Sequence, residues 1–244
     1  MKENKYDDQA FFEKYCQMDR SVKGLAGAGE WHILQTMLPD FKGKRVLDLG
    51  CGFGWHCEYA IEHGAKSAVG IDISEKMLEQ ARRRNGSNKI EYICAPIEDV
   101  DFPCGYFDIV ISSLAFHYLE SFEEICAKVS SYLSPGGAFV FSVEHPIFTA
   151  YGTEDWYYDE NGNIAHWPVD RYFTEGKRDS VFLGEQVTKY HKTLTTYLNT
   201  LLTSGFMITG LIEPQPSEEV LDTVEGMRDE LRRPMMLIVS AEKK

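Results

Sequence analysis

The sequence lacks the features of a membrane or secreted protein. No apolar run approaches the roughly 18 residues that cross a bilayer, and the charged start Met1-Lys2-Glu3-Asn4-Lys5 is unlike a signal peptide. The six cysteines, at positions 16, 51, 57, 94, 104 and 126, include no Cys-x-x-Cys pair. This spacing argues against a disulfide framework and against a zinc site. We therefore expect a cytoplasmic protein with no membrane partner and no metal.

The sequence is also poor in basic residues. The 25 Lys and Arg against 38 Asp and Glu give a formal net charge of −13. A nucleic-acid partner requires clustered basic side chains that neutralise phosphates. The longest basic cluster, Arg82-Arg83-Arg84, falls at the end of a predicted helix, where it complements the helix dipole. We expect no nucleic-acid partner.

A glycine-rich turn follows the first apolar strand, in the segment Val46-Leu47-Asp48-Leu49-Gly50-Cys51-Gly52-Phe53-Gly54. The apolar residues suit a buried parallel strand, and the alternating glycines suit a tight turn into a helix. A loop without Cβ atoms lets a ligand lie against backbone N–H groups. Asp72 ends the next apolar run, 22 residues after Gly50, where such folds bind the hydroxyls of a ribose. The pattern predicts a nucleoside site.

The details of the turn restrict the nucleoside. A dinucleotide fingerprint requires a third glycine at position 55 or 57, and Trp55 and Cys57 stand there. No Lys-Ser or Lys-Thr follows the glycines, which excludes a P-loop. Asp48 would repel a pyrophosphate and attract an ammonium group. These features favour a ribose with a cationic amino-acid tail, as in S-adenosylmethionine.

Four segments resemble motifs of the class I S-adenosylmethionine-dependent methyltransferases. They are Asp48 to Gly54, Gly70-Ile71-Asp72-Ile73-Ser74-Glu75-Lys76-Met77-Leu78, Phe107-Asp108-Ile109-Val110-Ile111-Ser112-Ser113-Leu114-Ala115, and Leu133-Ser134-Pro135-Gly136-Gly137. The resemblance covers residues 44–145 tightly and the rest loosely. It implies the family's fold and its cofactor, S-adenosyl-L-methionine, whereas the family's acceptors are too diverse to carry over.

The predicted elements agree with that fold. Strands expected at 45–49, 67–72, 90–94, 107–113 and 138–144 alternate with helices at 55–63, 74–84 and 122–133, which indicates a parallel sheet. After a helix at 193–204, strands at 206–213 and 235–241 flank a helix at 217–231 that Ser217 caps, and the resemblance implies an antiparallel pair at one edge. We expect a Rossmann-like, doubly wound, seven-stranded and mostly parallel sheet with helices on both faces. One domain, 1–244, would comprise a helical lid (1–43), a cofactor-binding core (44–145), a cap (146–190) and a C-terminal helix with edge strands (191–244).

The resemblance also implies which residues bind the cofactor. The expected set is Tyr15, Arg20, Asp48, Gly50, Cys51, Gly52, Gly54, Asp72, Ile73, Met77, Pro96, Ile97 and Ser113. Arg20, in the lid after an amphipathic helix at 7–19, would pair with the methionine carboxylate, or else be a surface charge. Pro96 stands where relatives place an acid that accepts the adenine amino group. Recognition of the adenine would then depend on the backbone N–H of Ile97 and on the shape of the site.

The segment 146–190 holds ten of the 31 aromatic residues in the chain, and Asn161-Gly162 within it signals a β-hairpin. An insertion after a strand of such a sheet lies beside the cofactor crevice. We interpret it as a substrate cap with aromatic walls. The alternative is a dimer surface, which also favours Trp and Tyr; the chain is expected to be a monomer or a homodimer.

Histidines after the fourth and fifth strands are the candidate general bases. His145 follows the fifth strand before Pro146, His117 follows the fourth, and His191 lies after the cap. Imidazole has the pKa that a base needs, and His145 shares the parity of the apolar residues 139, 141 and 143. Each histidine could instead bond a backbone carbonyl.

The predicted function is methyl transfer from S-adenosylmethionine to a small molecule. The acidic charge and the aromatic cap motivate the choice of a small acceptor. The alternatives are a non-catalytic protein that binds or senses the cofactor, a macromolecule methyltransferase, or an enzyme that transfers another group from the sulfonium.

Overall fold

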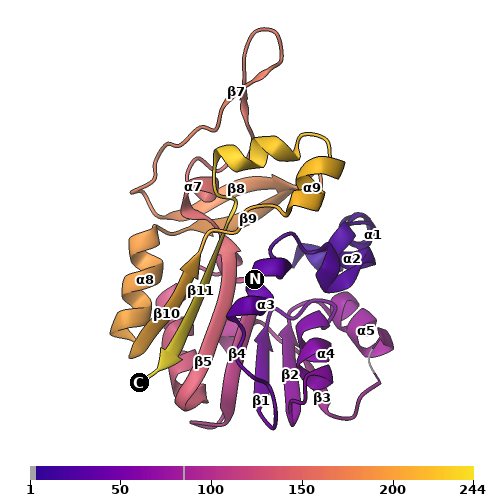
Figure 1. Ribbon diagram of the computed structural model, residues 1–244, viewed down its shortest axis with the longest axis vertical. Coiled ribbons are helices and arrows are strands. Elements are labelled where there is room, and N and C mark those ends of the chain that lie inside the picture. The colour runs from indigo at the N-terminus through magenta and orange to yellow at the C-terminus, as the bar shows by residue number, and fades with distance from the viewer. Residues whose placement is uncertain (1–3, 85) are drawn as a thin grey trace.

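Buried apolar strands form the central sheet of the computed structural model, which describes residues 4–84 and 86–244. The strand order is β10-β11-β5-β4-β1-β2-β3 (Figure 1). The strands are β1 (Arg45–Leu49), β2 (Ser67–Asp72), β3 (Ile90–Cys94), β4 (Phe107–Ser113), β5 (Leu133–Glu144), β10 (Phe206–Ile212) and β11 (Met236–Lys243). The pairs from β5 to β3 are parallel, and β11 runs antiparallel to both β5 and β10. The Rossmann-like sheet with an antiparallel edge, predicted from the sequence, is confirmed.

Alternate residues of these strands enter different hydrophobic cores, because successive side chains of a strand point to opposite faces. Leu47 and Phe141 pack on one face with α6 (Phe122–Tyr132) and α8 (Leu194–Thr203). Val46 and Ile111 pack on the other face with α4 (Trp55–Glu62) and α5 (Glu75–Arg84). On that second face, Leu34 of α3 (Trp31–Met37) covers β5 and β11. Helices therefore cover both faces, as expected.

Three predicted elements differ from the structure. The helix expected at 7–19 is divided into α1 (Gln9–Cys16) and α2 (Asp19–Val22), which follow the short helix η1 (Lys5–Asp7). The helix expected at 217–231 is divided into α9 (Glu218–Thr223) and η5 (Met227–Arg232), because Gly226 between them has a φ of 78°. The strand expected at 138–144 begins earlier, at Leu133. Ser217 and Ser74 do cap their helices, with hydroxyl oxygens that accept the N–H groups of Val220 and Met77.

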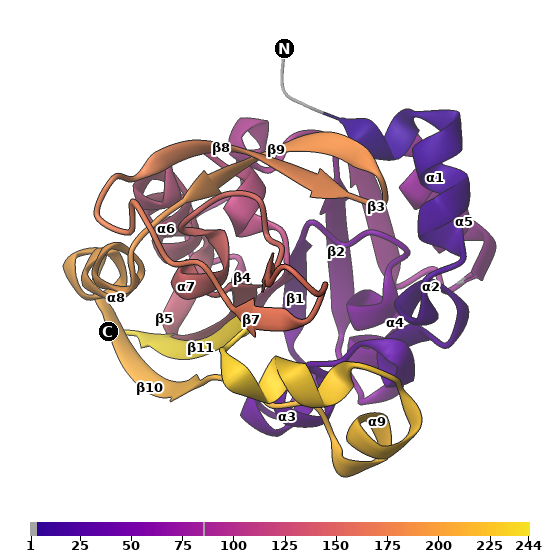
Figure 2. The ribbon, with the colours of Figure 1, turned by 90° about the horizontal axis from the view of Figure 1, so that it is seen from above.

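The insertion after β5 stands above the carboxyl ends of the sheet (Figure 1). It contains α7 (Pro146–Thr149), the expected hairpin of β6 (Tyr157–Tyr158) and β7 (Ile164–His166), and a second hairpin of β8 (Gly176–Phe182) and β9 (Glu185–His191). The view from above places β8–β9, α1 and α9 around the region where β1 and β2 end (Figure 2). The short helices η2 (Gly24–Gly27), η3 (Ile97–Asp99) and η4 (Phe116–Tyr118) complete the chain. Of the helices in the described ranges, none is both long and apolar enough to cross a membrane.

Candidate functional site

The glycine turn after β1 folds onto the end of β2. The N–H groups of Gly50 and Cys51 both donate to the carbonyl oxygen of Ile71, at 2.8 and 2.9 Å. Gly50 has a φ of 79°, and a Cβ added there would lie 2.4 Å from the Cβ of Ala115. A side chain at this position would be strained by the backbone and would clash with the loop after β4. The turn therefore requires glycine at position 50.

Asp72, the last residue of β2, ties the turn to the sheet. Its carboxylate accepts the N–H of Gly52 at 2.8 Å and the N–H of Ser74 at 2.9 Å. Burial raises the pKa of Asp72 to about 6, although these two N–H groups favour the charged form. The carboxylate keeps further lone pairs that can accept hydroxyl groups. Asp72 is thus oriented by the backbone at the edge of a cavity.

A cavity of about 920 Å³ lies between the carboxyl ends of the strands, the N-terminal helices and the insertion. Its size is near the upper end of the range for small-molecule sites, roughly 300–1,000 Å³. Ten of the residues expected to bind the cofactor line it: Tyr15, Arg20, Gly50, Gly52, Asp72, Ile73, Met77, Pro96, Ile97 and Ser113. The structure therefore brings together residues from positions 15 to 113 around one space.

Two expected cofactor residues are placed elsewhere. Asp48 is completely buried and does not line the cavity; its carboxylate lies 3.7 Å from the Cys57 sulfur and 4.0 Å from Nδ1 of His56. Burial raises its pKa to about 7. Gly54 starts α4 with a φ of 76°, and a Cβ there would lie 2.2 Å from the hydroxyl of Tyr92. Neither residue lines the cavity, and cofactor binding by either stays a prediction.

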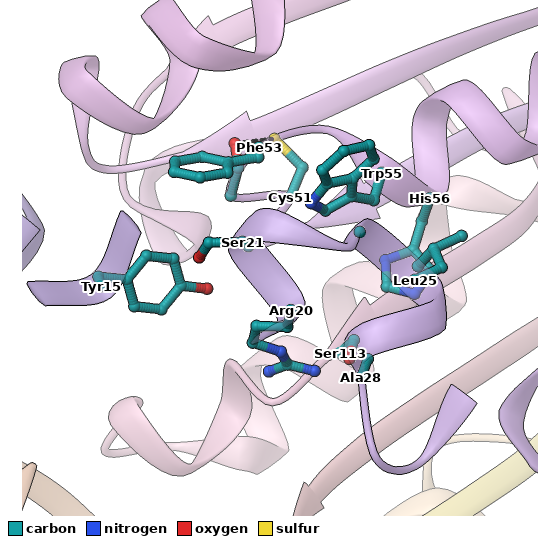
Figure 3. Close-up of a pocket in the computed structure, with 13 residues that line it drawn as sticks. Tyr15, Arg20, Ser21, Leu25, Ala28, Cys51, Phe53, Trp55, His56 and Ser113 are labelled. Carbon is teal, nitrogen blue, oxygen red and sulfur yellow. Dashed lines mark hydrogen bonds between the residues drawn. The ribbon is translucent and has the colours of Figure 1, made fainter. Parts of the chain in front are cut away.

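Cys51 lines a smaller pocket of about 60 Å³ beside the glycine turn (Figure 3). Its thiol is buried, and burial raises its pKa well above the ordinary value. A thiol held in the neutral form is a poor nucleophile. Cys51 therefore serves as a small residue of the turn.

Arg20 and Ser113 converge on a carboxylate that the sequence reasoning missed. Glu30 Oε1 accepts from Arg20 Nη2 at 2.6 Å and from the Ser113 hydroxyl at 3.0 Å. Figure 3 shows the Arg20 guanidinium beside Ser113, with Tyr15 also pointing into this region. Burial would raise the pKa of Glu30, which is 1% exposed, but Arg20 holds it below the ordinary value. The result is a charged pair at the cavity wall. No sequence motif marks Glu30, which precedes α3 without capping it.

His145 does not line the cavity. It precedes α7 as its N-cap, and its Nδ1 accepts the N–H of Ile147 at 3.0 Å. Its Nε2 lies 2.9 Å from a carboxylate oxygen of Glu213, on the loop after β10. Proline is common at the first position of a helix, and Pro146 there makes the preceding residue a cap. This arrangement leaves His145 outside the cavity lining with both ring nitrogens close to other groups, and its role as a general base stays a prediction. His191 is likewise engaged, by Thr149 and by the carbonyl of Tyr172.

His117 lines the cavity together with Glu144, the last residue of β5. Nδ1 of His117 accepts the backbone N–H of Glu144 at 3.4 Å, so the neutral ring carries its hydrogen on Nε2. Nε2 lies 3.8 Å from Glu144 Oε2, too far for a hydrogen bond. Burial lowers the pKa of His117 to about 4, despite the opposing effect of Glu144. His117 is therefore a neutral side chain beside a carboxylate.

A buried lysine joins two carboxylates of the cavity wall. Lys189 Nζ in β9 lies 2.6 Å from Glu144 Oε1 and 2.6 Å from Glu154 Oε2, and Lys189 is 1% exposed. Burial, reinforced by Glu144, raises the pKa of Glu154 to about 8. Glu154 has a φ of 54°, a conformation that costs energy for a residue with a Cβ. All three side chains line the cavity, and the sequence reasoning named none of them as a site residue.

The aromatic residues of the insertion contribute less to the cavity than expected. Phe148, Phe182 and Tyr190 line it. Trp156 and Trp167 instead pack around the Arg233 guanidinium, whose carbon lies 5.0 and 4.2 Å from their ring centres. These contacts pack the insertion against the segment before β11. In the described parts of the chain, no three His, Cys, Asp or Glu side chains are grouped closely enough to hold a metal ion.

Comparisons with known proteins agree with the geometry. Residues 47–141 match the family model described as a methyltransferase domain. A structure from Listeria monocytogenes described as an S-adenosylmethionine-dependent methyltransferase is 57% identical, with a TM-score of 0.86 over 91% of this chain and 99% of that one. One from Mesorhizobium loti, described as an S-adenosylmethionine-dependent methyltransferase, is 44% identical, with a TM-score of 0.84 over 90% and 100%. An uncharacterized protein of Haemophilus influenzae is 34% identical over 98% of this chain and 96% of its own length.

Proposed function

The chain belongs to the class I S-adenosylmethionine-dependent methyltransferases, and we propose that it transfers the methyl group to a small molecule held under the insertion 146–190. S-adenosylmethionine is the methyl donor. The observation that carries the proposal is that the glycine turn and the insertion line the same cavity of about 920 Å³. An acceptor in this cavity would lie beside the donor, and a concave cavity of this size suits a small molecule.

The residues of the cavity fit the donor. Glycine at position 50 permits the tight turn that borders the cavity, because a Cβ there would lie 2.4 Å from the Cβ of Ala115. The Asp72 carboxylate would accept the ribose hydroxyls, and Ile97 with Pro96 would flank the adenine. Arg20, already oriented by Glu30, would hold the methionine carboxylate.

Alignment is the main task of this chain's residues. The donor supplies an electrophilic methyl group on a sulfonium, whose leaving group is a neutral thioether and needs no acid. The turn and Asp72 fix one partner, and the residues of β9 and the end of β5 surround the other. Holding two reactants in line converts a bimolecular step into an effectively unimolecular one, which lowers the barrier substantially. His117 orients Glu144 by accepting its backbone N–H.

Labelled donor tests the proposal directly. The purified chain is incubated with methyl-labelled S-adenosylmethionine and a complete cell extract, which is then separated into small molecules, protein and RNA. We expect label in the small-molecule fraction. Label confined to protein or RNA would refute the small-molecule acceptor, because the enzyme would then be a macromolecule methyltransferase. Calorimetric binding of S-adenosylhomocysteine without any transfer would indicate a protein that only binds the cofactor.

A further inference from the structure

The part of the cavity under the insertion contains an unused hydrogen-bond acceptor. We call this part the cap half; its walls include His117, Glu144, Phe148, Glu154 and Lys189. Oε1 of Glu144 accepts a hydrogen bond from Lys189 Nζ. Oε2 of Glu144 is buried and has no hydrogen-bond partner in the described structure. A buried acceptor without a donor is unfavourable, because the hydrogen bonds it lost with water are not replaced. A ligand that brings a donor to this oxygen would recover that free energy.

The charges of the cap half select the chemical class of the ligand. Lys189 is already engaged by Glu144 and Glu154, so it has little attraction left for an anion. Glu120 adds a further acid to the lining of the cavity, and Lys177 adds a base that is mostly exposed, at 59% for its side chain. A carboxylate or phosphate ligand would face the ionised carboxylate of Glu144. A neutral or cationic ligand that donates a hydrogen would not.

The available bases narrow the choice between nitrogen and oxygen nucleophiles. An alcohol must lose its proton during methylation, and this requires a general base within reach. His117 has its Nδ1 engaged and its Nε2 already protonated, so neither nitrogen can take that proton. Burial would raise the pKa of Glu144, but His117 and the ammonium of Lys189 hold it below its ordinary value, which makes Glu144 a weak base. Burial raises the pKa of Glu154 to about 8, but both of its oxygens are engaged, by Ser180 and by Lys189. A neutral amine needs no base, because its lone pair is free.

We propose that the acceptor is an amine, and that Glu144 Oε2 binds the N–H of its reacting nitrogen. This inference rests on the proposed function. The nitrogen lone pair forms the new C–N bond while the C–S bond of the donor breaks, and that bonding pair returns to sulfur. The positive charge therefore moves from sulfur to nitrogen, and the product is an ammonium ion. An ionised carboxylate beside the nitrogen stabilises this developing charge.

The rest of the cluster holds Glu144 in its charged form. Lys189 binds one oxygen of Glu144 at 2.6 Å, and Glu154 contacts the same ammonium at 2.6 Å. The Ser180 hydroxyl donates to Glu154 at 3.1 Å, which orients it despite its strained backbone. Lys189 and Glu154 are therefore positioning residues, and Glu144 is the group that contacts the acceptor.

The experiment identifies the atom that receives the label. The chain is incubated with carbon-13 methyl S-adenosylmethionine and a deproteinised small-molecule extract, and the products are assigned by mass spectrometry and NMR. We expect the methyl group on nitrogen. A methyl group on oxygen, carbon or sulfur would overturn the amine assignment and leave the proposed function intact. Absence of label from the small molecules would overturn both.

Variants then test Glu144. The unmethylated form of the labelled amine is titrated into protein saturated with S-adenosylhomocysteine. We expect Glu144→Gln to weaken amine binding by about 10–100-fold, the range for a hydrogen bond to a charged group, while the affinity for S-adenosylhomocysteine is unchanged. The control Glu123→Gln removes an exposed carboxylate of α6 and should change neither affinity.

The fold of the Glu144 variant is monitored in the same titration. Intact binding of S-adenosylhomocysteine shows that Glu144→Gln is folded, and undiminished amine binding would then overturn the role of Glu144. If Glu144→Gln fails to bind S-adenosylhomocysteine, Glu144→Asp replaces it, because aspartate keeps the charge for Lys189 but withdraws the oxygen from the cavity. Amine binding equal to that of the unmodified protein in Glu144→Asp would likewise refute the contact.

Discussion

Asp72 makes the cofactor site sensitive to a single atom change. In Asp72→Asn, an amide nitrogen replaces one of the two oxygens that accept the N–H groups of Gly52 and Ser74. The side chain also loses the charge that attracts ribose hydroxyls. Each unmet hydrogen bond of this kind costs roughly 1–3 kcal/mol. We therefore expect the affinity for S-adenosylhomocysteine to fall about 5–150-fold, since 1.4 kcal/mol corresponds to about tenfold.

The pH dependence provides an independent signature of the same carboxylate. Binding of hydroxyls favours the ionised form, and burial raises the pKa of Asp72 to about 6 in the free protein, with Asp7 adding to the increase. Affinity should therefore weaken below pH 6, approaching about tenfold per pH unit. The contribution of Asp72 to folding stability changes with pH in the opposite direction. A raised carboxyl pKa contributes stability that is full below the unfolded pKa of 3.8 and is lost as the pH rises through about 6.

Isothermal titration calorimetry with S-adenosylhomocysteine at pH 7.5 and pH 5.5 measures the affinity and its pH dependence. The control is Asp108→Asn, since Asp108 also accepts a backbone N–H, that of Arg45 at 2.8 Å, but lies at the opposite end of the sheet. Asp108→Asn should retain the affinity and its pH dependence, and Asp72→Asn should lose both. Equal affinities of Asp72→Asn and the unmodified protein at pH 7.5 would refute the placement of the ribose on Asp72.

Three further substitutions have defined outcomes. Gly50→Ala should abolish binding of S-adenosylhomocysteine in calorimetry and lower the melting temperature, because its Cβ would lie 2.4 Å from that of Ala115; normal binding would contradict the tight turn. Glu30→Ala leaves Arg20 without its buried partner, so we expect a loss of about 3–5 kcal/mol in chemical denaturation, and a loss below 1 kcal/mol would show the pair to be solvated. His145→Ala should cost about 1 kcal/mol of stability as a lost helix cap, with turnover within tenfold of normal; a turnover loss of 10² or more would restore it as a base.

The sequence was sufficient for the fold and for the cofactor. The glycine turn and Asp72 are local features, because a tight turn from strand to helix restricts the residues that can form it. The strands that flank them alternate with helices at the spacing of a parallel sheet. Both features depend on neighbouring residues in the chain, which is why a single sequence shows them.

The cluster around Lys189 could not be predicted in this way. Its partners Glu144 and Glu154 lie 45 and 35 positions earlier, and the pairs form only because β8–β9 folds back over the end of β5. The same applies to Glu30 and Ser113, which are 83 positions apart. Charged residues in a sequence are usually solvated, so a buried group of them has no local signature.

At the end of β5, the structure places Glu144 in the cavity lining and leaves His145 outside it. Adjacent strand residues face opposite sides, and His145 shares the parity of the apolar residues 139, 141 and 143, which favours the histidine as the residue that enters the cavity. The strand ends at Glu144 as expected, but Pro146 begins a helix whose first N–H groups need an acceptor. His145 Nδ1 accepts the backbone N–H of Ile147, and the side chain lies outside the cavity lining. Glu144 remains at the carboxyl end of the sheet, where it faces Lys189. The site therefore presents a fixed negative charge instead of a titrating base, which suits a reaction that moves positive charge onto the acceptor.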